Sequence, residues 1–90
     1  MIPTAESAIE AQVRSILRDH SGLEEAAMSV DVHESLWQRG MTSLASVDVM
    51  VALESTFGFE FPDSYLRHAT FGTIFNIVGC VSVLIGSPVR

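Results

Sequence analysis

The sequence predicts an all-α fold, a small antiparallel four-helix bundle with three main helices, one short helix and a long first loop. Apolar residues recur at spacings of three and four in three separate segments. No segment shows the strict alternation of apolar and polar residues that marks a half-buried strand. The chain has 90 residues, enough for one core, so we expect a single domain over residues 1–90.

The first helix is predicted over residues 4–20. Its apolar residues lie at helical spacing and are expected in the core: Ile9, Val13, Ile16 and Leu17. The charged residues among them are expected to face water: Glu6, Glu10, Arg14 and Arg18. Pro3 precedes this segment and Ser21-Gly22 follows it, as is typical of helix ends.

The connection over residues 21–42 is long for a compact domain, so it needs packing of its own. We expect Leu36 and Trp37 to hold it against the core, with a short helical turn within it. The connection then brings Gly40 close to Ser43.

The second helix is predicted over residues 43–57, with Gly58 as its C-cap. One face is expected in the core: Val49, Met50, Leu53 and Phe57. The other face mixes apolar and acidic residues: Leu44, Val47, Asp48, Val51, Glu54 and Ser55. Such a face is either a solvated surface or a docking surface for partner proteins.

The rest of the chain predicts a short helix over residues 63–68 and a last helix over residues 71–85. Thr70 is the expected cap of the last helix. The expected core stripe is Phe71, Ile74, Phe75, Val78, Val81, Leu84 and Ile85. Residues 86–88, Gly-Ser-Pro, should stop the helix.

Composition limits the partners and the compartment. The net charge of −6 argues against nonspecific binding to nucleic acid or to an anionic membrane. The single cysteine, Cys80, cannot form an internal disulfide, which fits the cytoplasm. Residues 69–89 carry no charge, but polar residues and glycines interrupt them, so we expect a buried helix and no membrane span. No secretory signal is visible at the N-terminus.

The titratable residues do not predict catalysis or a metal site. His20, His33 and His68 lack metal-ligand spacing to one another or to Cys80. Cys80 lies in an apolar helical pattern and is interpreted as a packing residue. The acidic residues of the second helix are too far apart for an acid–base pair. We expect a protein that is not an enzyme and holds no metal.

Ser43 is the candidate for chemical modification. It follows Gly40 by three residues and precedes Leu44, at the predicted start of the second helix. Serine is a favoured N-cap, and the start of a helix favours a negative group such as a phosphate ester. A serine in this position is more often only a cap, so the motif alone leaves both interpretations open.

A larger pattern surrounds this serine. It comprises residues 36–44, Val47, Leu53-Glu54, Phe57-Gly58 and Phe61-Pro62-Asp63, in that order. It resembles the acyl carrier protein and peptidyl carrier protein family, whose G-x-D-S-L motif precedes a helix ending near L-E-x-x-F and a hydrophobic-Pro-Asp turn. The resemblance implies that Ser43 carries 4′-phosphopantetheine. Thr42 stands where the family has an acidic residue, which leaves the identity of the transferase open.

The resemblance also implies a function. Residues 40–47 and 60–66 look most like small stand-alone bacterial aminoacyl carrier proteins. The implied partners are a phosphopantetheinyl transferase that uses Mg²⁺ and coenzyme A, an amino acid:carrier protein ligase and a downstream acceptor enzyme. The expected docking residues are Leu44, Val47, Asp48, Val51 and Glu54, and we expect a monomer. A fatty-acid or polyketide carrier is the nearest alternative. A helical interaction module without a prosthetic group is the alternative from another class.

Overall fold

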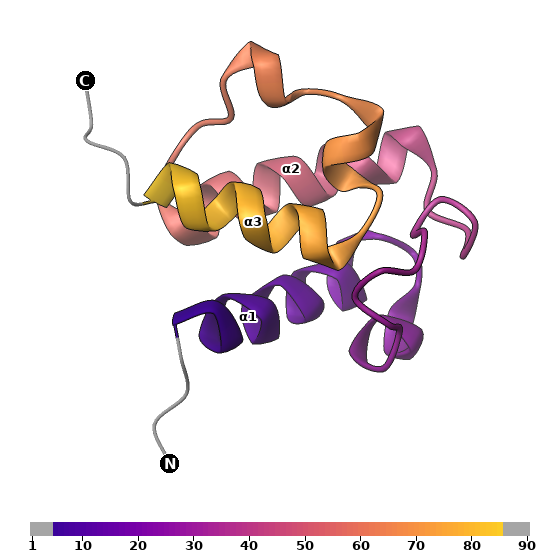
Figure 1. Ribbon diagram of the computed structural model, residues 1–90. Helices are drawn as coiled ribbons and strands as arrows, with labels where there is room; N and C mark the ends of the chain where they lie inside the picture. Colours follow the sequence, from indigo (N-terminus) through magenta and orange to yellow (C-terminus); the bar gives the residue numbers. More distant parts are fainter. Residues whose placement is uncertain (1–4, 86–90) are drawn as a thin grey trace.

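The computed structural model describes residues 5–85, which form three α-helices and no strand. The helices are α1 (Ala5–His20), α2 (Ser43–Phe57) and α3 (Ile74–Ile85) (Figure 1). This confirms the all-α fold class and the three main helices. The predicted turn in the first loop is a 3₁₀ segment, Glu24–Met28. The predicted short helix is two 3₁₀ segments, Asp63–Tyr65 and His68–Phe71.

α2 and α3 both pack against α1. Figure 1 shows α1 running opposite to the other two helices, while α2 and α3 run in the same direction. The predicted antiparallel relation therefore holds for α1 with each of its neighbours. Because α2 and α3 are parallel, the chain between them must return toward the start of α2.

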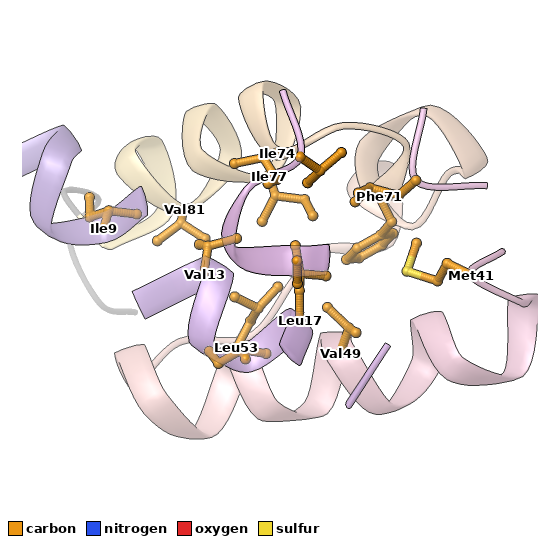
Figure 2. Packing of buried hydrophobic residues seen from close by; sticks show 14 of the residues in the cluster. Ile9, Val13, Leu17, Met41, Val49, Leu53, Phe71, Ile74, Ile77 and Val81 are labelled. Carbon is orange, nitrogen blue, oxygen red and sulfur yellow. The ribbon is translucent and has the colours of Figure 1, made fainter. Parts of the chain in front are cut away.

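The core lies where α1 meets the other two helices. Figure 2 shows side chains from all three helices converging there. Leu17, Leu53 and Ile77 are fully buried at this point, one from each helix. Burying one such side chain stabilises the fold by about 1.5–3 kcal/mol. The predicted core stripe of α1 is confirmed at all of its positions: Ile9, Val13, Ile16 and Leu17.

Arg14 corrects the prediction that the charged residues of α1 face water. Its side chain is only 15% exposed, and its Nε pairs with Glu10 at 3.0 Å. Its Nη1 donates to the carbonyl oxygens of Ala27 at 3.1 Å and Val30 at 2.8 Å. Ala27 lies near the end of the 3₁₀ segment Glu24–Met28 and Val30 follows it, so Arg14 supplies a donor to carbonyls at the exit of this segment. Arg14 therefore fastens the long loop to α1.

Leu36 and Trp37 hold the same loop at its other end, as predicted. Leu36 is fully buried, and its N–H donates to the Gly72 carbonyl oxygen at 2.7 Å. The Trp37 Nε1–H donates to the His68 carbonyl oxygen at 3.1 Å, and the two rings stack with centroids 4.2 Å apart. The first loop is therefore bonded to the segment that precedes α3.

The start of α3 differs from the prediction. Thr70 and Phe71 are the buried residues of the 3₁₀ segment His68–Phe71, and α3 begins at Ile74. The Thr73 hydroxyl, and not that of Thr70, accepts the N–H of Asn76 at 3.0 Å. A threonine hydroxyl satisfies an otherwise unpaired amide of the first helical turn, and Thr73 has the right spacing to do so.

The predicted core stripe is confirmed in large part, because Phe71, Ile74 and Val81 are buried and Val78 and Leu84 pack against the core. Ile74, Ile77 and Val81 are fully buried, although Ile77 was not in the predicted stripe. Phe75 and Ile85 were predicted in the core but are 59% and 43% exposed. Since most residues of α3 are apolar, its sequence allows more than one buried face. Packing against α1 selects the one that is observed.

No helix within residues 5–85 is long and apolar enough to cross a membrane. Residue 4, predicted to start the first helix, and residues 86–88, predicted to end the last, lie outside the described residues.

Candidate functional site

The N-cap of α2 is Thr42 and not Ser43, which corrects the sequence prediction. Thr42 has extended backbone angles (φ −92°, ψ 163°), and its hydroxyl accepts the Ala45 N–H at 3.0 Å. Ser43 is then the first residue of the helix. Threonine and aspartate both act as N-caps, so Thr42 can perform the capping role of the aspartate that the motif usually has there.

The Ser43 side chain is exposed, and its hydroxyl makes no hydrogen bond within residues 5–85. Because Thr42 provides the cap, this hydroxyl is free to react. Ser46, one turn later, differs because its hydroxyl donates to the Ser43 carbonyl oxygen at 2.6 Å. The arrangement distinguishes Ser43 from the next serine of the same helix.

The loop before Ser43 is held in place by its own backbone bonds. Met41 is buried, and its N–H donates to the Leu36 carbonyl oxygen at 3.0 Å. Gly40 has a φ of +115°, a conformation that residues with a Cβ rarely adopt. Gly40, the glycine of the G-x-x-S-L motif, therefore allows the chain to turn into Met41. The buried Met41 side chain then anchors the loop just before the exposed Ser43.

The face of α2 that follows Ser43 is exposed and largely apolar. Leu44, Val47 and Val51 are 83%, 52% and 50% exposed, and Asp48 is also exposed. The residues predicted on the opposite face are buried to different degrees. Val49 and Leu53 are fully buried, whereas Met50 and Phe57 are half-buried against the core. The predicted separation of the two faces is present in the structure.

Glu54 has a structural bond that the sequence analysis did not foresee. Its carboxylate is half-buried and accepts the Phe61 N–H at 2.9 Å. Phe61 is buried and lies edge-on to Phe71, with ring centroids 5.3 Å apart. Glu54 thus fixes the start of the chain that returns toward Ser43. In the sequence, Leu53-Glu54 and Phe61-Pro62-Asp63 appeared only as two parts of the family pattern, which does not say that they interact.

The other titratable residues do not form a site. His20, His33 and His68 are exposed, and within the described part of the chain no three His, Cys, Asp or Glu residues could hold a metal ion together. Cys80 is half-buried against the core, and burial raises the pKa of its thiol. A raised pKa lowers the thiolate fraction, so this cysteine is a poor nucleophile.

The chain matches the family of the phosphopantetheine attachment site over residues 11–78. The chain belongs to this family. The resemblance predicted from the motif is thereby confirmed, and so is 4′-phosphopantetheine as the prosthetic group of this carrier protein.

Known carrier proteins are similar in sequence and in structure. An aminoacyl carrier protein of Agrobacterium fabrum (strain C58 / ATCC 33970) is 30% identical over 77 residues, which are 86% of this chain and 93% of the relative. A similar chain is found in crystals of an engineered Bradyrhizobium japonicum glycine:[carrier protein] ligase complexed with carrier protein from Agrobacterium tumefaciens and ATP. It is 30% identical to this chain, with a TM-score of 0.79. That match covers 84% of this chain and 99% of the other.

Two further structures agree. The corresponding complex with AMP contains a chain that is 32% identical, with a TM-score of 0.77, covering 81% of this chain and 97% of the other. A solution structure of a protein from Agrobacterium tumefaciens is 31% identical, with a TM-score of 0.65, covering 82% of this chain and 89% of the other. The carrier fold and family are thus established. The residue that carries the group and the residues that contact partners stay predictions.

Proposed function

We propose that Ser43 carries the 4′-phosphopantetheine group and that the loaded protein holds an amino acid for transfer between enzymes. The observation that carries this proposal is the exposed Ser43 hydroxyl, which the neighbouring Thr42 cap leaves without a hydrogen bond among residues 5–85. It lies in the Gly-x-x-Ser-Leu motif on a surface that a modifying enzyme can reach.

Attachment requires a phosphopantetheinyl transferase with Mg²⁺ and coenzyme A. The Ser43 oxygen attacks the pyrophosphate of coenzyme A, a new P–O bond forms, the hydroxyl proton is lost and adenosine 3′,5′-bisphosphate leaves. The terminal thiol of the group supplies the nucleophile on which an amino acid is held as a thioester. The chain itself supplies the serine and a surface by which enzymes recognise it.

Amino acid cargo is supported by the relatives. Both the named aminoacyl carrier protein and the carrier of the glycine:[carrier protein] ligase complexes are about 30% identical to this chain over most of its length. A ligase of that kind is the proposed loading enzyme, and an acceptor enzyme that takes the aminoacyl group is the proposed downstream partner. Tethering raises the effective concentration of the cargo at each docked enzyme.

The proposed docking surface is the exposed face of α2 that begins beside Ser43. Leu44, Val47 and Val51 offer apolar contact, and Asp48 offers negative charge to a basic partner. Because the carrier must leave each enzyme after transfer, a small and partly polar interface suits it. Glu54 borders this surface, although its bond to the Phe61 N–H gives it a structural role as well.

The experiment has two stages. The chain is incubated with coenzyme A, Mg²⁺ and a broad-specificity transferase, and intact mass is measured for the wild type and Ser43→Ala. The holo protein is then given a glycine:[carrier protein] ligase, ATP and glycine, and hydroxylamine is added to release the thioester.

We expect one added group in the wild type, none in Ser43→Ala, and glycine that hydroxylamine removes. Efficient charging by a fatty-acyl carrier synthetase, without charging by the ligase, would support the fatty-acid or polyketide alternative. A group that is still added in Ser43→Ala would overturn Ser43 as the attachment residue.

A further inference from the structure

We propose that Arg67 binds the phosphodiester at Ser43 and holds the phosphopantetheine arm in the groove between α2 and residues 66–71. This inference rests on the proposed attachment at Ser43 and goes beyond it, because it assigns a resting place to the arm and a residue that selects it.

The groove begins at Ser43 itself. It has a volume of about 430 Å³ and lies between the first two turns of α2 and the segment that returns from α2 to α3. Figure 1 shows this return toward the start of α2. Val47 and Met50 line the α2 side, and Leu66 and Phe71 line the other side. A flexible group attached at Ser43 therefore has an apolar surface directly beside its point of attachment.

One wall of the groove is held rigidly. Trp37 and His68 both line it, and their rings stack nearly parallel, with centroids 4.2 Å apart and planes 14° apart. The Trp37 N–H bond to the His68 carbonyl oxygen at 3.1 Å fixes this pair. The groove thus exists before any ligand enters it, which lowers the ordering cost of binding.

Arg67 is the basic residue that lines the same groove. The other arginines of residues 5–85 each have a carboxylate partner, at distances of 3.0, 3.1 and 3.2 Å: Arg14, Arg18 and Arg39. Arg67 has no carboxylate partner among the described residues and is exposed. On a chain of net charge −6, an unpaired guanidinium beside the attachment serine is therefore a distinctive feature.

The chemistry of the two groups is complementary. A phosphodiester carries one negative charge, and a guanidinium donates two parallel N–H bonds to phosphate oxygens. An exposed ion pair is weak between separate molecules. Here the covalent bond at Ser43 holds the phosphodiester near the groove, so a weak contact is enough to bias the position of the arm.

The test compares apo and holo protein by amide and indole NMR chemical shifts. Intact mass shows that each holo sample is fully converted. Trp37 is the sole tryptophan of the chain and provides one indole N–H resonance in the wall of the groove. The variants are Arg67→Gln and Arg67→Lys. Arg18→Gln is the matched control, because it removes an equal charge from an exposed residue that does not line the groove.

We expect holo conversion to shift the resonances of Trp37 and His68 in the wild type and in Arg18→Gln. The ratio of docked to free arm should fall about two- to fivefold in Arg67→Gln, the range expected for one exposed ion pair, and should fall less in Arg67→Lys. Added salt should lower it in the wild type more than in Arg67→Gln. Thermal midpoints of the apo variants check that the fold is intact.

Three results of the NMR comparison would overturn the inference. They are groove shifts as large in Arg67→Gln as in the wild type, shifts confined to residues next to Ser43, and an equal effect of Arg18→Gln. Slower loading of Arg67→Gln by a ligase, with no change in the apo–holo shifts, would instead place Arg67 in a partner interface and would also overturn it. Failure of the proposed attachment is distinguishable, because the wild type would then gain no mass.

Discussion

Removing the Thr42 and Ser43 hydroxyls one at a time should separate helix stability from chemical attachment. In Thr42→Ala, the Ala45 N–H loses its acceptor at 3.0 Å, and loss of such an N-cap costs about 1 kcal/mol. For a domain of this size, that loss lowers the thermal midpoint by about 4–8 °C. Ser43→Ala removes a hydroxyl without a hydrogen bond in residues 5–85, and alanine is the better helix former. Its stability should change by less than about 0.5 kcal/mol.

The assay measures two quantities for each variant: urea unfolding by circular dichroism, and mass after incubation with coenzyme A, Mg²⁺ and a transferase. Thr42→Ala should be destabilised but labelled, whereas Ser43→Ala should be stable but unlabelled. Thr42→Ser is the matched control, because serine retains the capping hydroxyl. The reasoning is refuted if Ser43→Ala loses the stability and Thr42→Ala keeps it, because Ser43 would then be the cap.

Further predictions concern docking, the first loop and the cysteine. Val47→Arg and Val51→Arg should each slow ligase loading about tenfold or more, which corresponds to a loss of roughly 1.4 kcal/mol of binding free energy. Thr56→Arg, at an exposed position of the same helix, is the control. Normal loading of both valine variants would show that this face is only solvated surface, and unfolding would show that it is core. Arg14→Met should lower the free energy of unfolding by about 1–3 kcal/mol, because two loop carbonyls lose their donor; an unchanged urea midpoint would contradict this. Burial raises the pKa of the Cys80 thiol, so its alkylation by iodoacetamide should become half-maximal at a higher pH in the folded than in the urea-unfolded chain. The same shift means that any folding stability from the neutral Cys80 thiol is present below its ordinary pKa and is lost as the pH rises through the pKa of the folded protein. Equal alkylation profiles of the folded and unfolded chains would contradict the assigned burial.

The bounds of α2 could be predicted from the sequence because local signals mark both ends. Two adjacent cap-forming residues, Thr42 and Ser43, precede it, and Gly58 follows it with a φ of +73°, in the left-handed conformation that a C-cap needs. The sequence did not determine which of the two hydroxyls forms the cap. Serine and threonine are both favoured N-caps, and the choice depends on which backbone angles the preceding loop imposes.

The features that could not be predicted depend on contacts between distant parts of the chain. Arg14 bonds to carbonyls 13 and 16 residues later, and Glu54 bonds to an N–H seven residues later. Helical periodicity describes only which way these side chains point within one helix. Both residues were therefore interpreted as charges on a water-facing side, and the partners became apparent only when the loops were in place. Phe75 and Ile85 were placed in the core and Ile77 was left out because most of α3 is apolar, so its few polar residues, Asn76 and Ser82, mark the exposed side only weakly.

The buried and exposed faces of α2 allow one helix both to form part of the core and to present the proposed docking surface. Val49 and Leu53 are fully buried, so substitutions there act on stability. Val51 lies on the exposed face, so a change there creates no cavity and, under the proposed docking, acts on partner binding. Val47 is exposed on that face and also lines the groove beside Ser43. Under the two proposals, a partner that covers Val47 competes with an arm resting in the groove, so docking favours release of the arm toward the enzyme.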